Sequence, residues 1–217
     1  MALVMYDLDG TLVETVEEIA CAVNMTLSQH EHNEVSVSQI KVLIGNGTEW
    51  LMKQVWPDQS VIETPWVWNV IMEEFTYHYK EVVGTSSKPY PHVLETLKAV
   101  KKLGIKQAVI TNKEQQFVKR VLEKNGIESF FDLVVSGNTL AVKKPDPAVI
   151  HYCLDALSEG AETSLFVGDS AIDIATARNA KITCWAVPYG YNGGKDIRLS
   201  NPDRLIQDLS VVPQFFN

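Results

Sequence analysis

The stretch MALVMYDLDGTL, residues 1–12, decides the fold of this 217-residue chain. Its apolar run, residues 2–6, is short and ends abruptly in polar residues, which predicts a strand buried on both faces of a sheet. Two carboxylates, Asp7 and Asp9, follow at once. Ligands of open parallel sheets bind beyond the carboxyl ends of the strands. We therefore expect an α/β fold whose functional site begins at Asp7.

Further short apolar runs rich in Val and Ile predict more strands, at residues 107–110, 133–135, 165–167 and 182–187. Amphipathic patterns between these runs predict helices over residues 93–103 and 117–122, and from Asp146 to about Leu157. We expect Asp146 to be the N-cap of that last helix and Pro147 to be its first residue. Strands that alternate with helices are typical of a parallel sheet covered on both faces.

Residues 16–83 interrupt this alternation. They contain no convincing strand, and several helical patterns follow one another there. The turn-forming stretch GTSSKP, residues 84–89, then returns the chain to the sheet. We therefore expect a core made of residues 1–15 and 84–217, with residues 16–83 as a helical insert.

Polar side chains also follow the later predicted strands. Thr111 and Asn112 come directly after the second strand, Lys144 lies beyond the third, and Asp169 and Asp173 follow the fourth. Because the carboxyl ends of parallel strands meet at one edge of a sheet, we expect these residues to gather around Asp7 and Asp9.

This set of residues suits phosphoryl transfer. Oxygen ligands from Asp7, Asp9 and Asp169 favour Mg²⁺ over zinc. One carboxylate could attack phosphorus to form an aspartyl-phosphate, and a second could serve as general acid and base. A hydroxyl, backbone amides and a lysine could hold the phosphoryl oxygens. Asp173 either supports this site or caps the helix that follows Asp169.

The order of these residues resembles the four motifs of the haloacid dehalogenase superfamily. The matching segments are DLDGTL at 7–12, TN at 111–112, KKPDP at 143–147 and GDSxxD at 168–173. Within that superfamily the chain is similar to the phosphoglycolate phosphatase group, through IGNG at 44–47, YPHVLETL at 90–97 and YGYN at 189–192. The resemblance implies a Rossmann-like core with a helical cap inserted after the first motif, which agrees with the predicted insert.

The resemblance also implies a role for each matching residue. Asp7 would be the nucleophile and a metal ligand, and Asp9 would be the acid/base and would bind the metal through its backbone carbonyl. Lys144 would hold the nucleophile and the phosphate. Thr111 and Asn112 would bind the phosphate, Asp169 would ligate Mg²⁺ with Asp173 in support, and Gly45, Asn46 and Gly47 would face the substrate.

The expected reaction is the hydrolysis of 2-phosphoglycolate or a similar small phosphomonoester. A phosphatase for a sugar phosphate or a nucleotide, and a phosphosugar mutase, are the alternatives within the same fold. A non-catalytic phosphate-binding protein is disfavoured, because a binding protein needs no acid/base beside a nucleophile.

Composition limits the partners. A net charge of −8 and a pI near 5.1 provide no basic face for nucleic acid. No apolar run approaches the ~18 residues that span a bilayer, and three scattered cysteines fit a reducing compartment. We expect a cytoplasmic protein, either monomer or homodimer, whose partner is a small phosphorylated metabolite.

Overall fold

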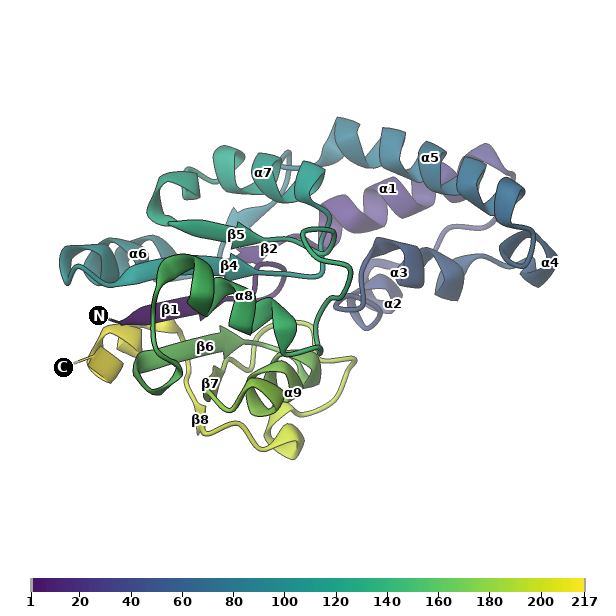
Figure 1. Cartoon of the computed structure of the whole chain (residues 1–217). Helices are drawn as coiled ribbons and strands as arrows, with labels where there is room; N and C mark the ends of the chain where they lie inside the picture. The colour runs from purple at the N-terminus through teal and green to yellow at the C-terminus, as the bar shows by residue number, and fades with distance from the viewer. Residues whose placement is uncertain (1, 217) are drawn as a thin grey trace.

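The computed structural model describes residues 2–216 and arranges them around a six-stranded parallel sheet (Figure 1). The strand order is β5-β4-β1-β6-β7-β8. The bounds are β1 Leu3–Tyr6, β4 Lys106–Ile110, β5 Leu133–Val135, β6 Ser164–Gly168, β7 Thr183–Ala186 and β8 Arg204–Leu205. The first strand lies in the centre, with Leu3 opposite both Lys106 of β4 and Ser164 of β6. The predicted α/β class and its parallel strands are confirmed, and β8 is an additional short edge strand.

Helices cover both faces of this sheet, because alternate residues of each strand point to opposite sides. Val4 and Tyr6 of β1 pack in one hydrophobic cluster with α6 (Val93–Lys102) and α7 (Gln115–Lys124). Leu3 and Met5 pack in a second cluster with α8 (Ala148–Leu157) and α9 (Ala171–Ala180). Short 3₁₀ helices complete the core at η1 Glu128–Phe130, η2 Ala161–Thr163, η3 Ile197–Ser200 and η4 Leu209–Phe216.

Helix α8 begins one residue later than the sequence predicts. Pro147 occupies the N-cap position and Ala148 is the first helical residue. The carboxylate of Asp146 nevertheless accepts a hydrogen bond from the Ala148 amide at 2.8 Å. Proline has no N–H, so the first amide that Asp146 can cap is the one after Pro147.

The helical insert, residues 16–83, lies between two very short strands, β2 (Val13–Glu14) and β3 (Lys88–Pro89). These strands pair antiparallel where the chain leaves the core and where it returns. The insert contains α1 Val16–Gln29, α2 Val37–Lys41, α3 Thr48–Val55, α4 Gln59–Ile62 and α5 Pro65–Val82. Helices α1 and α5 pack side by side and project away from the sheet, beyond the carboxyl end of β1 (Figure 1). This arrangement places the insert over the sheet edge where Asp7 lies.

The sequence also led to expectations about membrane-spanning segments and about the cysteines. Within residues 2–216, no helix combines the length and the apolar character needed to cross a membrane. Within residues 2–216 the three cysteines are free thiols: Cys153 is buried on α8, Cys184 is buried on β7 (Thr183–Ala186), and Cys21 is exposed on α1.

Candidate active site

A buried lysine joins two carboxylates at the carboxyl edge of the sheet. The Nζ atom of Lys144 lies 2.7 Å from Oδ1 of Asp7 and 2.7 Å from Oδ1 of Asp173. The Lys144 side chain is only 3% exposed. Burial acts to lower the pKa of Lys144, but the two carboxylates outweigh burial and hold it above its ordinary value. Lys144 therefore stays charged and fixes one oxygen of Asp7.

Three buried carboxylates form a candidate metal site. Asp7, Asp169 and Asp173 each offer an oxygen, and these atoms lie within 4.8 Å of one another. Burial raises the pKa of Asp7 to about 7, against the opposing effect of Lys144. Burial, followed by the charges of Asp7 and Asp173, raises the pKa of Asp169 well above its ordinary range. Carboxylates held in this way favour a cation between them.

The acidic cluster fits a divalent ion. Among the described side chains, three carboxylates meet there, and the ammonium group of Lys144 contacts two of them, Asp7 and Asp173. All of the acidic ligands are oxygen donors, which suits Mg²⁺. The residues present therefore fit the metal that the sequence predicts.

Asp173 caps helix α9 and also contacts Lys144. Its Oδ2 accepts hydrogen bonds from the amides of Asp169 and Ser170, at 3.2 and 3.0 Å, and from the Ser170 hydroxyl at 2.6 Å. With Ser170 it forms the capping box of α9, while its Oδ1 accepts from Lys144. A Cβ at Gly168 would lie 2.3 Å from Asp173, so only glycine allows this approach. Both oxygens of Asp173 are therefore engaged, one by the cap of α9 and one by Lys144.

Lys113 is a site residue to which the sequence analysis gave no role. Its Nζ lies 2.8 Å from Oδ1 of Asp9 and 5.0 Å from the centre of the Tyr79 ring. The hydroxyl of Thr15 donates to the same oxygen of Asp9 at 2.6 Å. In the sequence, the position of Lys113 directly after Thr111 and Asn112, at the end of β4, is the feature that indicates a place in the site. Asp9 is thus held by a lysine at the end of β4 and by the residue that directly precedes the insert.

The start of helix α1 departs from its local sequence pattern. TVEE at residues 15–18 has the spacing of a capping box, in which Thr15 and Glu18 would bond to each other's backbone. Thr15 instead bonds to Asp9, and Glu18 accepts from the Gly84 amide at 2.7 Å. The amides of Thr15 and Val16 donate to the hydroxyl of Tyr191, at 2.9 and 3.1 Å.

Asn112 ties the insert to the core. Its side-chain amide donates to the carbonyl of Gly45 at 2.9 Å and to the carbonyl of Lys144 at 3.0 Å. A Cβ at Gly137 would lie 2.2 Å from the Asn112 carbonyl oxygen, so glycine is required beside it. Thr111, which is 4% exposed, accepts from the Lys113 amide through its hydroxyl oxygen, and its hydroxyl hydrogen is available to a ligand.

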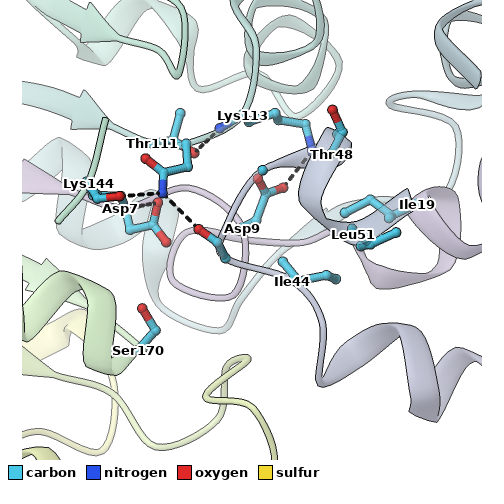
Figure 2. Close-up of a pocket in the computed structure, with 13 residues that line it drawn as sticks. Asp7, Asp9, Ile19, Ile44, Thr48, Leu51, Thr111, Lys113, Lys144 and Ser170 are labelled. Atoms are coloured by element: carbon cyan, nitrogen blue, oxygen red, sulfur yellow. Dashed lines mark hydrogen bonds and ion pairs between the residues drawn. The ribbon is translucent and has the colours of Figure 1, made fainter. Parts of the chain in front are cut away.

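These residues enclose a cavity of ≈ 40 Å³ between core and insert (Figure 2). This is about three times the ~10–15 Å³ that one water molecule needs. The core side carries the charged groups and the insert side carries apolar groups (Figure 2). The lining residues are Asp7, Asp9, Thr111, Asn112, Lys113, Lys144 and Ser170 from the core, and Ile19, Ile44, Gly45, Gly47, Thr48 and Leu51 from the insert.

The three loop residues that the sequence expects to face the substrate do not all line the cavity. Gly45 and Gly47 line the cavity, but Asn46 is not among its lining residues. The Asn46 carbonyl instead accepts from Lys143 at 2.7 Å, and Thr48 donates to Glu114 at 2.6 Å. Together with the contact from Asn112, these bonds hold the loop against the core.

Comparisons with known proteins identify the family of the chain. The family model for haloacid dehalogenase-like hydrolases matches residues 4–187. A phosphoglycolate phosphatase of Pseudomonas syringae pv. syringae is 35% identical over 97% of this chain and 78% of its own length. A phosphoglycolate phosphatase of Colwellia psychrerythraea is 35% identical over 91% of this chain and 89% of its own length. The crystal structure of a predicted phosphoglycolate phosphatase from Haemophilus somnus 129PT superposes with a TM-score of 0.92 at 30% identity, covering 100% of this chain and 98% of that one. The resemblance found in the sequence is confirmed.

Proposed function

We propose, from the premise that this chain belongs to the haloacid dehalogenase-like hydrolase family, that it hydrolyses 2-phosphoglycolate or a similar small phosphomonoester with Mg²⁺. Its class as a phosphoric monoester hydrolase follows from the family and from its phosphatase relatives. The observation that carries the mechanism is the contact at 2.7 Å between Lys144 and Asp7 inside a buried acidic cluster.

Asp7 is the proposed nucleophile. Lys144 holds its Oδ1, which leaves Oδ2 to attack phosphorus as the bond to the leaving oxygen breaks. Asp9 donates a proton to that oxygen through Oδ2, because its Oδ1 is engaged by Lys113 and Thr15. Asp9 then takes a proton from a water molecule, which attacks the phosphoryl group, frees Asp7 and releases inorganic phosphate. Thr111 is the proposed donor to the phosphoryl oxygens.

The proposed ligands of Mg²⁺ are the carboxylates of Asp7 and Asp169 and the backbone carbonyl of Asp9, with Asp173 in support. When bound, the ion neutralises charge on the phosphate and on the acidic cluster. Tyr191 and Thr11 orient Asp169, because their amide and hydroxyl donate to its two oxygens.

The size and chemistry of the cavity favour a small substrate. The cavity of ≈ 40 Å³ corresponds to the space of about three water molecules, which suits a small substrate. A sugar or a nucleoside would also need polar partners, whereas the described lining residues of the insert are apolar except for Thr48 and two glycines. Lys113, on the core side, is a cation that could meet the carboxylate of 2-phosphoglycolate.

We further propose that residues 16–83 act as a cap domain over a core of residues 1–15 and 84–217. Closure of a cap excludes water and strengthens the electrostatic interactions within the site. A cytoplasmic location, and a monomeric or homodimeric state, remain part of this proposal.

The test is a comparison of substrates with the purified protein. Phosphate release from 2-phosphoglycolate, a hexose phosphate and a nucleoside monophosphate is measured with Mg²⁺ and again with excess chelator. We expect the highest kcat/KM with 2-phosphoglycolate and a loss of turnover on chelation. A higher kcat/KM for the hexose phosphate or the nucleotide would refute the substrate. Exchange of phosphate between positions of a sugar, without release, would indicate a mutase instead.

A further inference from the structure

Helix α1 has an unusual N-terminus. The first amides of a helix lack partners within the helix and are normally satisfied by nearby side chains. Here the N-cap residue, Thr15, makes no side-chain cap bond. Its hydroxyl is committed to Asp9 at 2.6 Å, and Glu18 is committed to Gly84. Both members of the potential capping box are therefore used elsewhere.

A residue 176 positions away in the sequence supplies the missing acceptor. The hydroxyl oxygen of Tyr191 accepts from the amides of Thr15 and Val16, at 2.9 and 3.1 Å. Tyr191 is 3% exposed, and burial raises its pKa to about 12, so the hydroxyl is neutral at physiological pH. A neutral, buried phenol is a fixed acceptor at this position.

The same residue contacts the candidate metal site through its backbone. The amide of Tyr191 donates to Oδ2 of Asp169 at 2.5 Å, and Thr11 donates to the other oxygen at 2.6 Å. A Cβ at Gly190 would lie 2.2 Å from Asp169, so the glycine before Tyr191 permits this close contact. Tyr191 therefore contacts both a proposed metal ligand and the two residues at the junction of core and insert, Thr15 and Val16.

We propose that Tyr191 is a positioning residue that couples metal binding at Asp169 to the order of the junction where the insert begins. The coupling runs from Asp169 to the Tyr191 backbone, and from the Tyr191 hydroxyl to Thr15, whose own hydroxyl holds Asp9. Metal at Asp169 fixes the loop that carries Tyr191 and thereby stabilises the start of α1. The inference rests on the proposed function for its metal, but it concerns neither the substrate nor the reaction.

Amide hydrogen exchange tests this coupling without any turnover. Exchange of the Thr15 and Val16 amides is measured with and without Mg²⁺, in the wild-type protein and in Tyr191→Phe. In the wild type we expect Mg²⁺ to slow exchange about 5-fold or more, the lower end of typical coupling between sites. In Tyr191→Phe we expect faster exchange, by roughly 2- to 12-fold, because one acceptor is lost. In Tyr191→Phe, the exchange rates measured with and without Mg²⁺ should agree within about twofold.

Tyr189→Phe is the matched control, since Tyr189 donates to the Thr11 carbonyl and not to the junction. It should keep the wild-type ratio of rates with and without Mg²⁺. A general loss of stability in Tyr191→Phe would raise both rates together and leave the ratio unchanged, and that result would overturn the coupling.

Calorimetric titration with Mg²⁺ separates this inference from the proposed function. If the wild-type protein binds no Mg²⁺, both the proposed function and the coupling are wrong. If it binds Mg²⁺ and the ratio of rates is the same in wild type and Tyr191→Phe, the coupling alone is wrong.

Discussion

The two sides of the cavity are built from different chemistry. The core side carries four charged residues, each held by a partner of opposite charge, as in the contact of Lys144 with Asp7 and that of Lys113 with Asp9. The described lining residues of the insert side carry no charge and include Ile19, Ile44 and Leu51. The core is therefore suited to act on any phosphate group, and the insert is suited to select by size. Substitutions on the core side should therefore lower turnover, whereas substitutions on the insert side should change the preference between substrates.

The largest effect is expected on the core side, at the proposed nucleophile. Asp7→Asn should reduce turnover by roughly 10⁴-fold or more, because loss of a nucleophile removes the whole covalent route. Phosphate release with Mg²⁺ measures this effect. The melting temperature of the metal-free protein should not fall, since burial makes the charged form of Asp7 unfavourable. Turnover within tenfold of the wild type would show that Asp7 is not the nucleophile.

Metal binding should depend on pH. The pKa of Asp7 is about 7 in the folded, metal-free protein, above its ordinary value of 3.8. At Asp7 the folded state then binds more protons than the unfolded state between these values, so the contribution of Asp7 to the free energy of unfolding falls as pH rises from about 4 to about 7. Mg²⁺ requires the ionised carboxylates, so it should raise the melting temperature more at pH 8 than at pH 5. Thermal unfolding with and without Mg²⁺ provides the measurement, and an equal shift at both pH values would argue against a metal at Asp7.

A smaller and different effect is expected on the insert side. Ile44→Ala should enlarge the cavity and raise kcat/KM for larger phosphate esters, relative to 2-phosphoglycolate, by roughly 10-fold, the lower end of the effect of one methylene group in a pocket. Ile62→Ala, in the same insert but outside the cavity lining, is the control and should leave the preference unchanged. An unchanged preference in Ile44→Ala would mean that Ile44 does not limit substrate size.

The smallest effect is expected where the two sides meet at the surface. Lys143 donates to the Asn46 carbonyl at 2.7 Å, and such exposed contacts contribute about 0–1 kcal/mol. Lys143→Ala should raise KM by up to about 5-fold and leave kcat unchanged. The exposed Lys119, paired with Glu123 on α7, provides the control Lys119→Ala, which should change neither constant. A large fall in kcat for Lys143→Ala would place Lys143 in the chemistry.

The parts of the fold that could be predicted are those fixed by local pattern. The strand before Asp7 is a short apolar run that ends at a carboxylate, and the buried strand β1 lies there. The residues after each strand could be grouped in advance because parallel topology brings the carboxyl ends together. Strands β2, β3 and β8 were missed because two residues are too few to show a period.

The contacts that could not be predicted join residues far apart in the sequence. TVEE at 15–18 has the pattern of a capping box, yet tertiary contacts with Asp9 and Gly84 take both side chains. Tyr191 lies in a segment that suggested only a family resemblance, and its bonds to α1 depend on how two distant segments pack. Lys113 could be placed at the correct edge but not paired with Asp9, because the direction of a long side chain is not encoded in spacing.

Chemical trapping at Asp7 tests the covalent route most directly. The protein is mixed with 2-phosphoglycolate and Mg²⁺, quenched in acid within one turnover, and treated with borohydride, which reduces an acyl phosphate to the alcohol. Mass spectrometry of the N-terminal peptide should then find homoserine at residue 7. Complete release of phosphate with Asp7 unmodified at every time, or modification at another carboxylate, would contradict the account.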